Sequence, residues 1–224
     1  MLRKVLVVLC FIICLIFLSL FTLEYLDKQE GENFYKNVLP SNNLIDIDKL
    51  KNEYDEAIGY IEIPNTNISY PIMQGEDNNY YLKHLPNGDS NKIGSIFIDY
   101  RNNEFNDQNT IIYGHNFNNG TMFSDLLNYK SDDFYKNHSK YAIYVSDRKM
   151  EVEIFGVYVL DVTKEKIPIN FETLDVFNDY IDKIMENNLI KSNFEINEND
   201  RLVSLCTCAN GSWKNRLIVV GKVI

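Results

Sequence analysis

The strongest constraint on this chain is an uncharged apolar run near its N-terminus, residues 5–23. At about 1.5 Å of rise per residue the run forms a helix about 28 Å long, close to the ~30 Å of a bilayer core. A cleaved signal peptide is the alternative, but its apolar region usually has about 7–15 residues and ends in a small-x-small site. No such site follows the run. We therefore expect an uncleaved transmembrane anchor over residues 5–23.

The charges beside the run predict its orientation. Arg3 and Lys4 precede it, and Glu24 follows it. Positively charged flanks stay in the cytosol, so residues 1–4 are expected to be cytosolic. The chain after about residue 25 is then extracellular. The sequence thus predicts a single-pass protein of the cell membrane.

The acidic composition argues against one class of partner. The chain carries 22 Lys and Arg against 32 Asp and Glu, a formal net charge of −10, and has no block of basic residues. Nucleic-acid binding depends on neutralising phosphates with Lys and Arg. We therefore expect no nucleic-acid partner.

Residues 25–57 are expected to form a helical stalk. The first part is polar and compatible with a helix, and an amphipathic helix follows it. In that helix apolar residues recur at steps of three and four, among them Ile47, Leu50 and Tyr54. Asp46 is one of the residues able to cap its start.

Residues 58–224 are expected to form a mainly β domain. Short runs rich in β-branched and aromatic residues alternate there with turn-rich loops. Eight strands are predicted, at residues 58–63, 68–73, 94–100, 110–113, 141–146, 150–160, 201–208 and 216–223. Eight such strands favour a barrel or a sandwich. Between the sixth and seventh strands, a stripe that includes Phe177 and Ile184 predicts an inserted helix, capped by Thr173 or Asp175.

Two cysteines lie close together near the C-terminus. Cys206 lies inside the predicted strand, and Cys208 is its last residue. Residues two apart in a strand meet disulfide geometry poorly, so free thiols are expected. Cys206 is interpreted as a small strand residue, whereas the side chain of Cys208 can face a cleft.

A thiol becomes a nucleophile only as a thiolate, which a nearby imidazolium or guanidinium favours. His115 ends an apolar strand and follows a glycine, whereas His84 and His138 lie in polar loops and are expected to be surface residues. Arg216 opens the last strand, and a hairpin would return it to Cys208. We expect His115, Cys208 and Arg216 to meet at one rim of the fold.

A metal site is the rival interpretation of the same residues. A Cys-x-Cys pair with one distant histidine supplies three soft ligands. It lacks the paired C-x₂-C or H-x₃-H spacing of structural zinc sites. We therefore expect no metal and no cofactor.

Residues 204–208 (SLCTC), followed by Arg216, resemble the nucleophile signature of the sortases, membrane-anchored cysteine transpeptidases of Gram-positive bacteria. That signature is Thr-Leu-x-Thr-Cys with an arginine further on, and Ser204 replaces its first threonine. The resemblance covers nearly the whole ectodomain and is closest to class B sortases. Its other segments are YPIMQG at 70–75, DNNYYL at 77–82, GSIFIDYRN at 94–102, IYGHN at 112–116 and GTMF at 120–123.

The resemblance implies an eight-stranded sortase-type barrel with a pair of N-terminal helices. It also implies that Cys208 attacks the carbonyl of a threonine in the C-terminal sorting signal of a surface protein, giving a thioester. His115 would protonate the leaving amine and later deprotonate the incoming one, an amine of peptidoglycan. Arg216 would hold the substrate backbone and the oxyanion. The residues implied to shape the sorting-signal groove are Asn78, Leu82, Ser204 and Thr207.

Two alternatives remain open. A cysteine peptidase would pass the same acyl group to water. A non-catalytic cell-wall binding module would keep the barrel without its chemistry.

Overall fold

The computed structural model describes residues 2–38, 45–117, 120–192, 194–209 and 214–224. Its helices are α1 (Leu2–Val38), α2 (Ile47–Glu53), α3 (Asp132–Asn137) and α4 (Leu174–Glu186), with 3₁₀ turns η1 (Tyr80–Leu82) and η2 (Ser124–Lys130). The strands are β1 (Ala57–Glu62), β2 (Ser69–Met73), β3 (Ile96–Ile98), β4 (Asn109–Tyr113), β5 (Lys140–Tyr144), β6 (Lys149–Asp161), β7 (Leu202–Cys208) and β8 (Asn215–Val223). All eight predicted strands are present.

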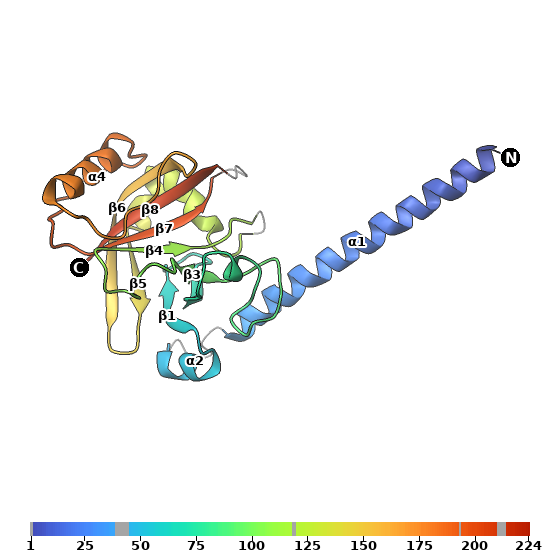
Figure 1. Ribbon diagram of the computed structural model, residues 1–224, viewed down its shortest axis with the longest axis horizontal. Coiled ribbons are helices and arrows are strands. Elements are labelled where there is room, and N and C mark those ends of the chain that lie inside the picture. Colours follow the sequence, from blue (N-terminus) through green and yellow to red (C-terminus); the bar gives the residue numbers. More distant parts are fainter. Residues whose placement is uncertain (1, 39–44, 118–119, 193, 210–213) are drawn as a thin grey trace.

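The strands close into a barrel in the order β1-β2-β3-β4-β7-β8-β6-β5 (Figure 1). Two neighbouring pairs are parallel, β2 with β3 and β4 with β7, and the other pairs are antiparallel. Closure leaves no unpaired sheet edge. The predicted mainly β barrel is thus confirmed.

Alternation along the strands separates two hydrophobic cores. Leu205 and Val219 belong to the main core. Their neighbours Cys206 and Ile218 belong to a second core, together with Phe177 of α4. Successive side chains of a strand point to opposite faces, so this second core lies on the sheet face that α4 covers.

Helix α4 is the predicted insertion between the sixth and seventh strands. The Thr173 hydroxyl caps it by accepting a hydrogen bond from the Val176 amide, at 3.3 Å. Phe177 and Ile184 are its buried residues. The helical stripe read from the sequence is therefore the face that packs on the barrel.

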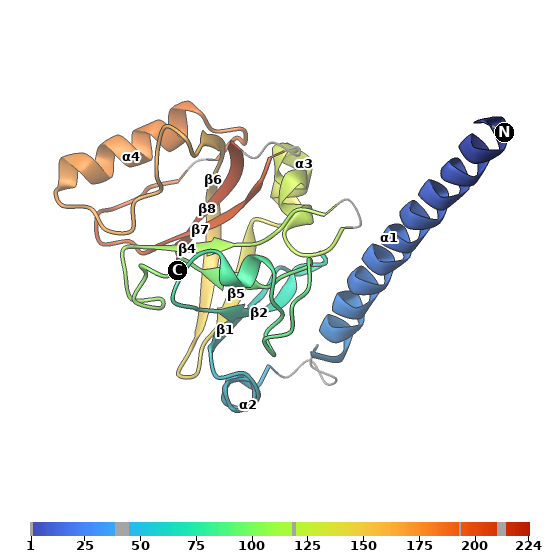
Figure 2. The same cartoon turned by 45° about the vertical axis from the view of Figure 1, so that its right-hand side comes forward.

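Helix α1 runs without a break from the predicted anchor into the predicted stalk, and projects from the barrel as a rod (Figures 1 and 2). Among the described residues it is the one helix long and apolar enough to cross a membrane. Its large apolar side chains between Val5 and Leu23 are exposed. An apolar surface of this size is costly in water, so α1 is a candidate single membrane span.

The end of α1 that is distant from the N-terminus docks on the barrel. The Tyr35 hydroxyl donates to the Gly94 carbonyl at 2.6 Å, and the Asn91 amide nitrogen donates to the Asp27 carbonyl at 2.6 Å. Helix α2 follows in the chain, begins at the cap Asp46 and buries Ile47. It ends at Glu53, earlier than predicted, because the chain turns there to enter β1.

Gly94 joins η1 to β3 in the left-handed region, with φ of +63°. A Cβ there would lie 2.6 Å from the Tyr81 carbonyl oxygen and 2.8 Å from that of Leu82. Gly88 also has a positive φ, +84°, but its nearest neighbour would be the Tyr80 hydroxyl at 3.5 Å. An alanine at either position would therefore be strained by the positive φ, but only an alanine at Gly94 would also collide with neighbouring carbonyl oxygens.

We predict that Gly94→Ala lowers the melting temperature of the full-length chain in detergent micelles more than Gly88→Ala does. Both variants add a left-handed alanine, at about 1–2 kcal/mol. Gly94→Ala adds overpacking of about 1–3 kcal/mol. At roughly 2–4 °C per kcal/mol for a chain of this size, circular dichroism resolves the difference. Equal shifts in the two variants would contradict the close approach at Gly94.

Candidate active site

A cavity of about 480 Å³ opens beside the ends of β4, β7 and β8. Five residues predicted from the sequence line it: Asn78, Leu82, His115, Cys208 and Arg216. They come from η1 and the loop before it, from the segment after β4, and from the paired strands β7 and β8. The fold thus gathers side chains that lie far apart in the sequence.

The β7–β8 ladder fixes the relation of the thiol to the guanidinium. Cys208 and Arg216 are directly opposite each other in this antiparallel pair. Opposite residues have their Cβ atoms about 4.5–5.5 Å apart and on the same face of the sheet. Cys208 is partly exposed and carries a free thiol. The predicted hairpin return of Arg216 to Cys208 is therefore what the strand register produces.

The parallel β4–β7 ladder brings the imidazole to the same end. Tyr113 pairs with Cys206, and two residues further along each chain stand His115 and Cys208. Gly114 donates its amide to the Cys206 carbonyl at 3.2 Å. The Asn116 amide nitrogen donates to the Cys208 carbonyl at 3.1 Å. These bonds hold the segment that carries His115 against the end of β7.

A hydrogen bond fixes which nitrogen of His115 exchanges a proton. Nε2 lies 2.7 Å from the Leu82 carbonyl oxygen. A carbonyl oxygen only accepts, so Nε2 carries a hydrogen and Nδ1 is the nitrogen that titrates. Burial lowers the pKa of His115, and the positive charge of Arg216 lowers it further; the bond to Leu82 opposes this without reversing it. The neutral imidazole is therefore the resting form at neutral pH.

Cys206 lies on the same face as Cys208 but deeper in the fold. It is buried, and burial raises the pKa of its thiol to about 12, although Arg216 opposes the rise. A thiol of that pKa stays protonated and is a poor nucleophile. This agrees with the interpretation of Cys206 as a packed strand residue.

The comparison with known families agrees with the sortase-like signature of residues 204–208 in β7. The sortase domain family matches residues 61–224. This chain belongs to the sortase family. It is 39% identical over 184 residues to sortase B of Listeria monocytogenes, an alignment that covers 81% of this chain and 74% of that protein.

Solved structures agree with the class. Sortase B of Clostridium perfringens superposes with a TM-score of 0.75 at 33% identity, covering 79% of this chain and 98% of that one. A sortase B complexed with triglycine superposes with a TM-score of 0.78 at 29% identity, covering 88% and 98%. The predicted similarity to class B sortases is confirmed, and the protein is a sortase-type cysteine transpeptidase.

Two residues expected in the substrate groove of the sortase lie elsewhere. Ser204 is fully buried and donates its hydroxyl to the Asn109 side chain at 2.9 Å. Thr207 is 2% exposed and donates to the Gly114 carbonyl at 2.8 Å. Neither is among the described residues that line the cavity. Ser204 lies too deep along β7, and Thr207 points to the opposite face from Cys208, so both brace the strands instead.

Sequence reasoning missed the charged part of the sortase cavity. Asp99, Arg101 and Tyr113 line it, and the Asp99 side chain is fully buried. The one signal was a carboxylate that closes an otherwise apolar run, followed two residues later by an arginine. That pattern alone does not distinguish a loop salt bridge from a cavity wall.

The other two histidines lie apart from this cavity. The His84 ring stacks on Tyr80 at 4.0 Å between centroids, and the His138 ring stacks on Phe134 at 4.1 Å. Neither is among the described residues that line the cavity with Cys208. Across the described ranges, no three His, Cys, Asp or Glu side chains are grouped to hold a metal ion.

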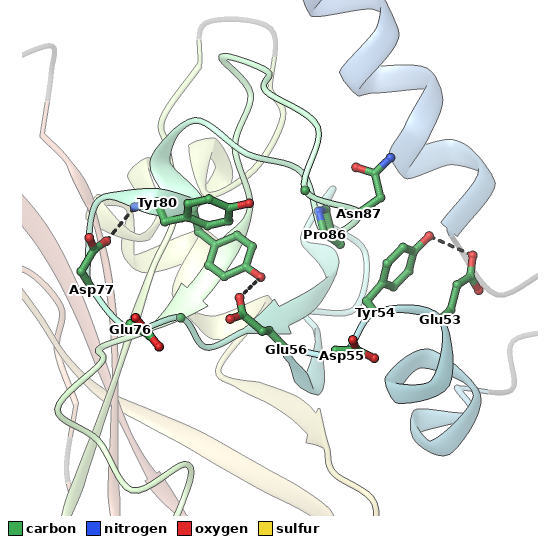
Figure 3. Close-up of a pocket in the computed structure, with 12 residues that line it drawn as sticks. Glu53, Tyr54, Asp55, Glu56, Glu76, Asp77, Tyr80, Pro86 and Asn87 are labelled. Atoms are coloured by element: carbon green, nitrogen blue, oxygen red, sulfur yellow. Dashed lines mark hydrogen bonds between the residues drawn. The ribbon is translucent and has the colours of Figure 1, made fainter.

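A second hollow, of about 510 Å³, lies between the α2–β1 junction and η1 (Figure 3). Carboxylates and tyrosines line it, and several of them bond to each other. Tyr54 donates to Glu53, and the backbone amide of Tyr80 donates to Asp77. Its described lining contains no thiol and no imidazole. The thiol, imidazole and guanidinium singled out from the sequence therefore lie together in the first cavity.

We predict that an NMR titration of His115 in the full-length chain gives a midpoint below 6.5, and that Arg216→Gln raises it. The lowered pKa has burial as its first cause and the Arg216 charge as a second, so removing the charge must favour the imidazolium. Lys222→Gln, further along β8, is the matched control and should leave the midpoint in place. An unchanged midpoint in Arg216→Gln would show that the guanidinium does not act on this imidazole.

Proposed function

We propose that this sortase cleaves the C-terminal sorting signal of surface proteins after a threonine and transfers them to an amine of peptidoglycan. The observation that carries the proposal is the pairing of Cys208 with Arg216 in one register, with His115 on the adjacent strand end. A nucleophile, a proton carrier and a cationic donor then share one cavity.

In the first step the Cys208 thiolate adds to the threonine carbonyl carbon. The tetrahedral intermediate collapses, the C–N bond breaks, and the leaving amine takes a proton from the His115 imidazolium. A thioester remains on Cys208. The lowered pKa of His115 makes the imidazolium a stronger acid, which favours this transfer.

Arg216 is proposed to stabilise the oxyanion. Its guanidinium offers several N–H donors in a planar fork and is placed opposite Cys208 by the β7–β8 ladder. Asn78 and Leu82, which line the same cavity, would contact the sorting signal. Ser204 and Thr207 act indirectly, because their hydrogen bonds hold β7 to its neighbours.

In the second step an amine attacks the thioester, and neutral His115 accepts its proton at Nδ1. The sulfur of Cys208 leaves as a thiolate, and a new amide forms. A solved sortase B holds triglycine, a short peptide, which supports a peptide amine as the acceptor class. Water in place of the amine gives the peptidase alternative.

The location of the chain follows from α1. We propose that residues 1–4 are cytosolic, that residues 5–23 span the membrane, and that residues 25–57 carry the barrel of residues 58–224 outside the cell. Arg3 and Lys4 at the cytosolic end fit this orientation. Both proposed substrates then meet the cavity at the outer face of the membrane.

The experiment that tests the function uses the full-length chain in detergent micelles with a library of threonine-containing peptides. Triglycine is added as the amine, and mass spectrometry identifies the products. We expect cleavage after threonine and a ligated product, both lost in Cys208→Ala and kept in Cys206→Ala. Hydrolysed product alone would indicate the peptidase. If no peptide is cleaved, and the thiols of Cys206 and Cys208 are alkylated equally slowly, the result would indicate the non-catalytic binding module.

We predict that Arg216→Lys lowers kcat/KM roughly 10²-fold, the usual loss of one oxyanion donor. Lysine keeps the charge but lacks the planar fork. Peptide cleavage kinetics measure the loss, with Lys222→Arg as the control on the same strand. Near-normal turnover in Arg216→Lys would show that only the charge of Arg216 matters.

A further inference from the structure

Asp99 is a fully buried carboxylate in the wall of the active-site cavity, just after β3. Arg101 binds it with two side-chain nitrogens, Nε and Nη2, each at 2.8 Å, and with its backbone amide at 3.0 Å. The Tyr113 hydroxyl donates to it at 2.9 Å, and the Asn78 amide nitrogen donates at 3.1 Å. Three cavity-lining side chains from three segments therefore converge on this carboxylate.

The carboxylate stays ionised in this setting. Burial alone raises the pKa of Asp99, but the hydrogen bonds and charge of Arg101, with the Tyr113 hydroxyl, lower it overall. An ionised carboxylate only accepts hydrogen bonds. Each neighbour must therefore turn a donor toward it, and this requirement sets the orientation of the cavity wall.

Asn78 is held at both ends of its amide. Its nitrogen donates to Asp99, and its oxygen accepts from the Tyr100 amide at 3.0 Å. The carboxamide thus cannot flip without losing both bonds. Within the described part of the chain no acceptor binds its second N–H, which can therefore donate to a ligand.

Tyr113 is constrained in the same way. Its hydroxyl hydrogen is committed to Asp99, so its oxygen can only accept from a ligand. Its ring lies 5.4 Å from that of Phe97, between centroids, and it stands two residues before His115. Donor and acceptor positions fixed in this way suit a peptide backbone, which offers both a carbonyl oxygen and an N–H.

A purely structural role in holding a loop is the competing explanation. The neighbouring carboxylate of Asp107 has such a role: it accepts from the Asn102 side chain at 2.9 Å and from the Asn103 amide at 2.7 Å. Asp107 is absent from the described cavity lining. Asp99 differs because its partners Asn78 and Tyr113 face the cavity.

We propose that Asp99 is a positioning residue for the sorting-signal peptide, which orients the Asn78 amide and the Tyr113 hydroxyl beside Cys208. The inference rests on the proposed function, since it needs a peptide in this cavity. It assigns Asp99 a role in binding and none in bond cleavage.

The test is Asp99→Asn in the full-length chain in micelles, with the library peptide that the unmodified enzyme cleaves fastest. The new amide has the same shape but one acceptor oxygen fewer, so Asn78 or Tyr113 must turn away. We expect KM to rise about tenfold, as for the loss of a charge-assisted hydrogen bond. The value of kcat should stay within about twofold, and the rate of Cys208 alkylation by iodoacetamide should not change.

Asp107→Asn is the matched control, and should leave KM unchanged even where it lowers the melting temperature. Asn78→Ala gives a second check, because Asp99→Asn should raise KM much less in that background. A rise in KM equal to that of Asp107→Asn, or a loss confined to kcat, would overturn the positioning role.

If Asp99→Asn does not fold, Asn78→Asp tests the same contact from the more exposed side. Two facing carboxylates repel, so KM should rise at pH 7 and recover as the pH falls. A KM that ignores pH in this variant contradicts the inference. The proposed function is judged separately by Cys208→Ala: cleavage that survives in that variant refutes the function, whereas a failure at Asp99 alone leaves it standing.

Discussion

Strand β7 is hydrogen-bonded on both sides, to β4 in parallel and to β8 in antiparallel fashion. Because side chains alternate along a strand, a slip of one residue in either ladder would turn Cys208 into the barrel and away from Arg216. The active site is therefore a property of the backbone register. Ser204 and Thr207 belong to this constraint, since their hydroxyls tie β7 to Asn109 and to the segment after β4.

Local patterns predicted most of the fold because they report on single elements. Runs of β-branched residues marked the eight strands, and a helical stripe marked α4. The β4–β7 contact was beyond this reasoning, since parallel neighbours ninety-odd residues apart leave no local trace. The same limit applies at the site. The sequence neighbourhood of Cys208 suggested Ser204 and Thr207. In the structure Ser204 is buried deep along β7 and Thr207 points to the other face of the sheet, so neither lines the described part of the cavity. Asp99 was missed because the burial of a charge is decided by tertiary partners.

The position of Arg216 serves two needs that oppose each other. A guanidinium beside Cys208 is where the proposed oxyanion needs a donor, but the same charge lowers the pKa of His115. A lowered pKa leaves fewer His115 side chains protonated at neutral pH, but it makes each imidazolium a stronger acid. In the proposed reaction, protonation of the leaving amine is the step that needs a strong acid.

The segment from η1 to β3 connects helix α1 to the candidate site. Tyr35 of α1 donates to the carbonyl of Gly94, and the tight backbone at Gly94 lies against the carbonyls of Tyr81 and Leu82. The Leu82 carbonyl in turn accepts from Nε2 of His115. The docking of α1 and the hydrogen bond that orients the imidazole thus share one stretch of backbone. A carbonyl held at this position leaves Nδ1 of His115 as the ring nitrogen able to exchange a proton. The nitrogen that the proposed mechanism uses is therefore selected by η1, outside the strands that carry Cys208 and Arg216.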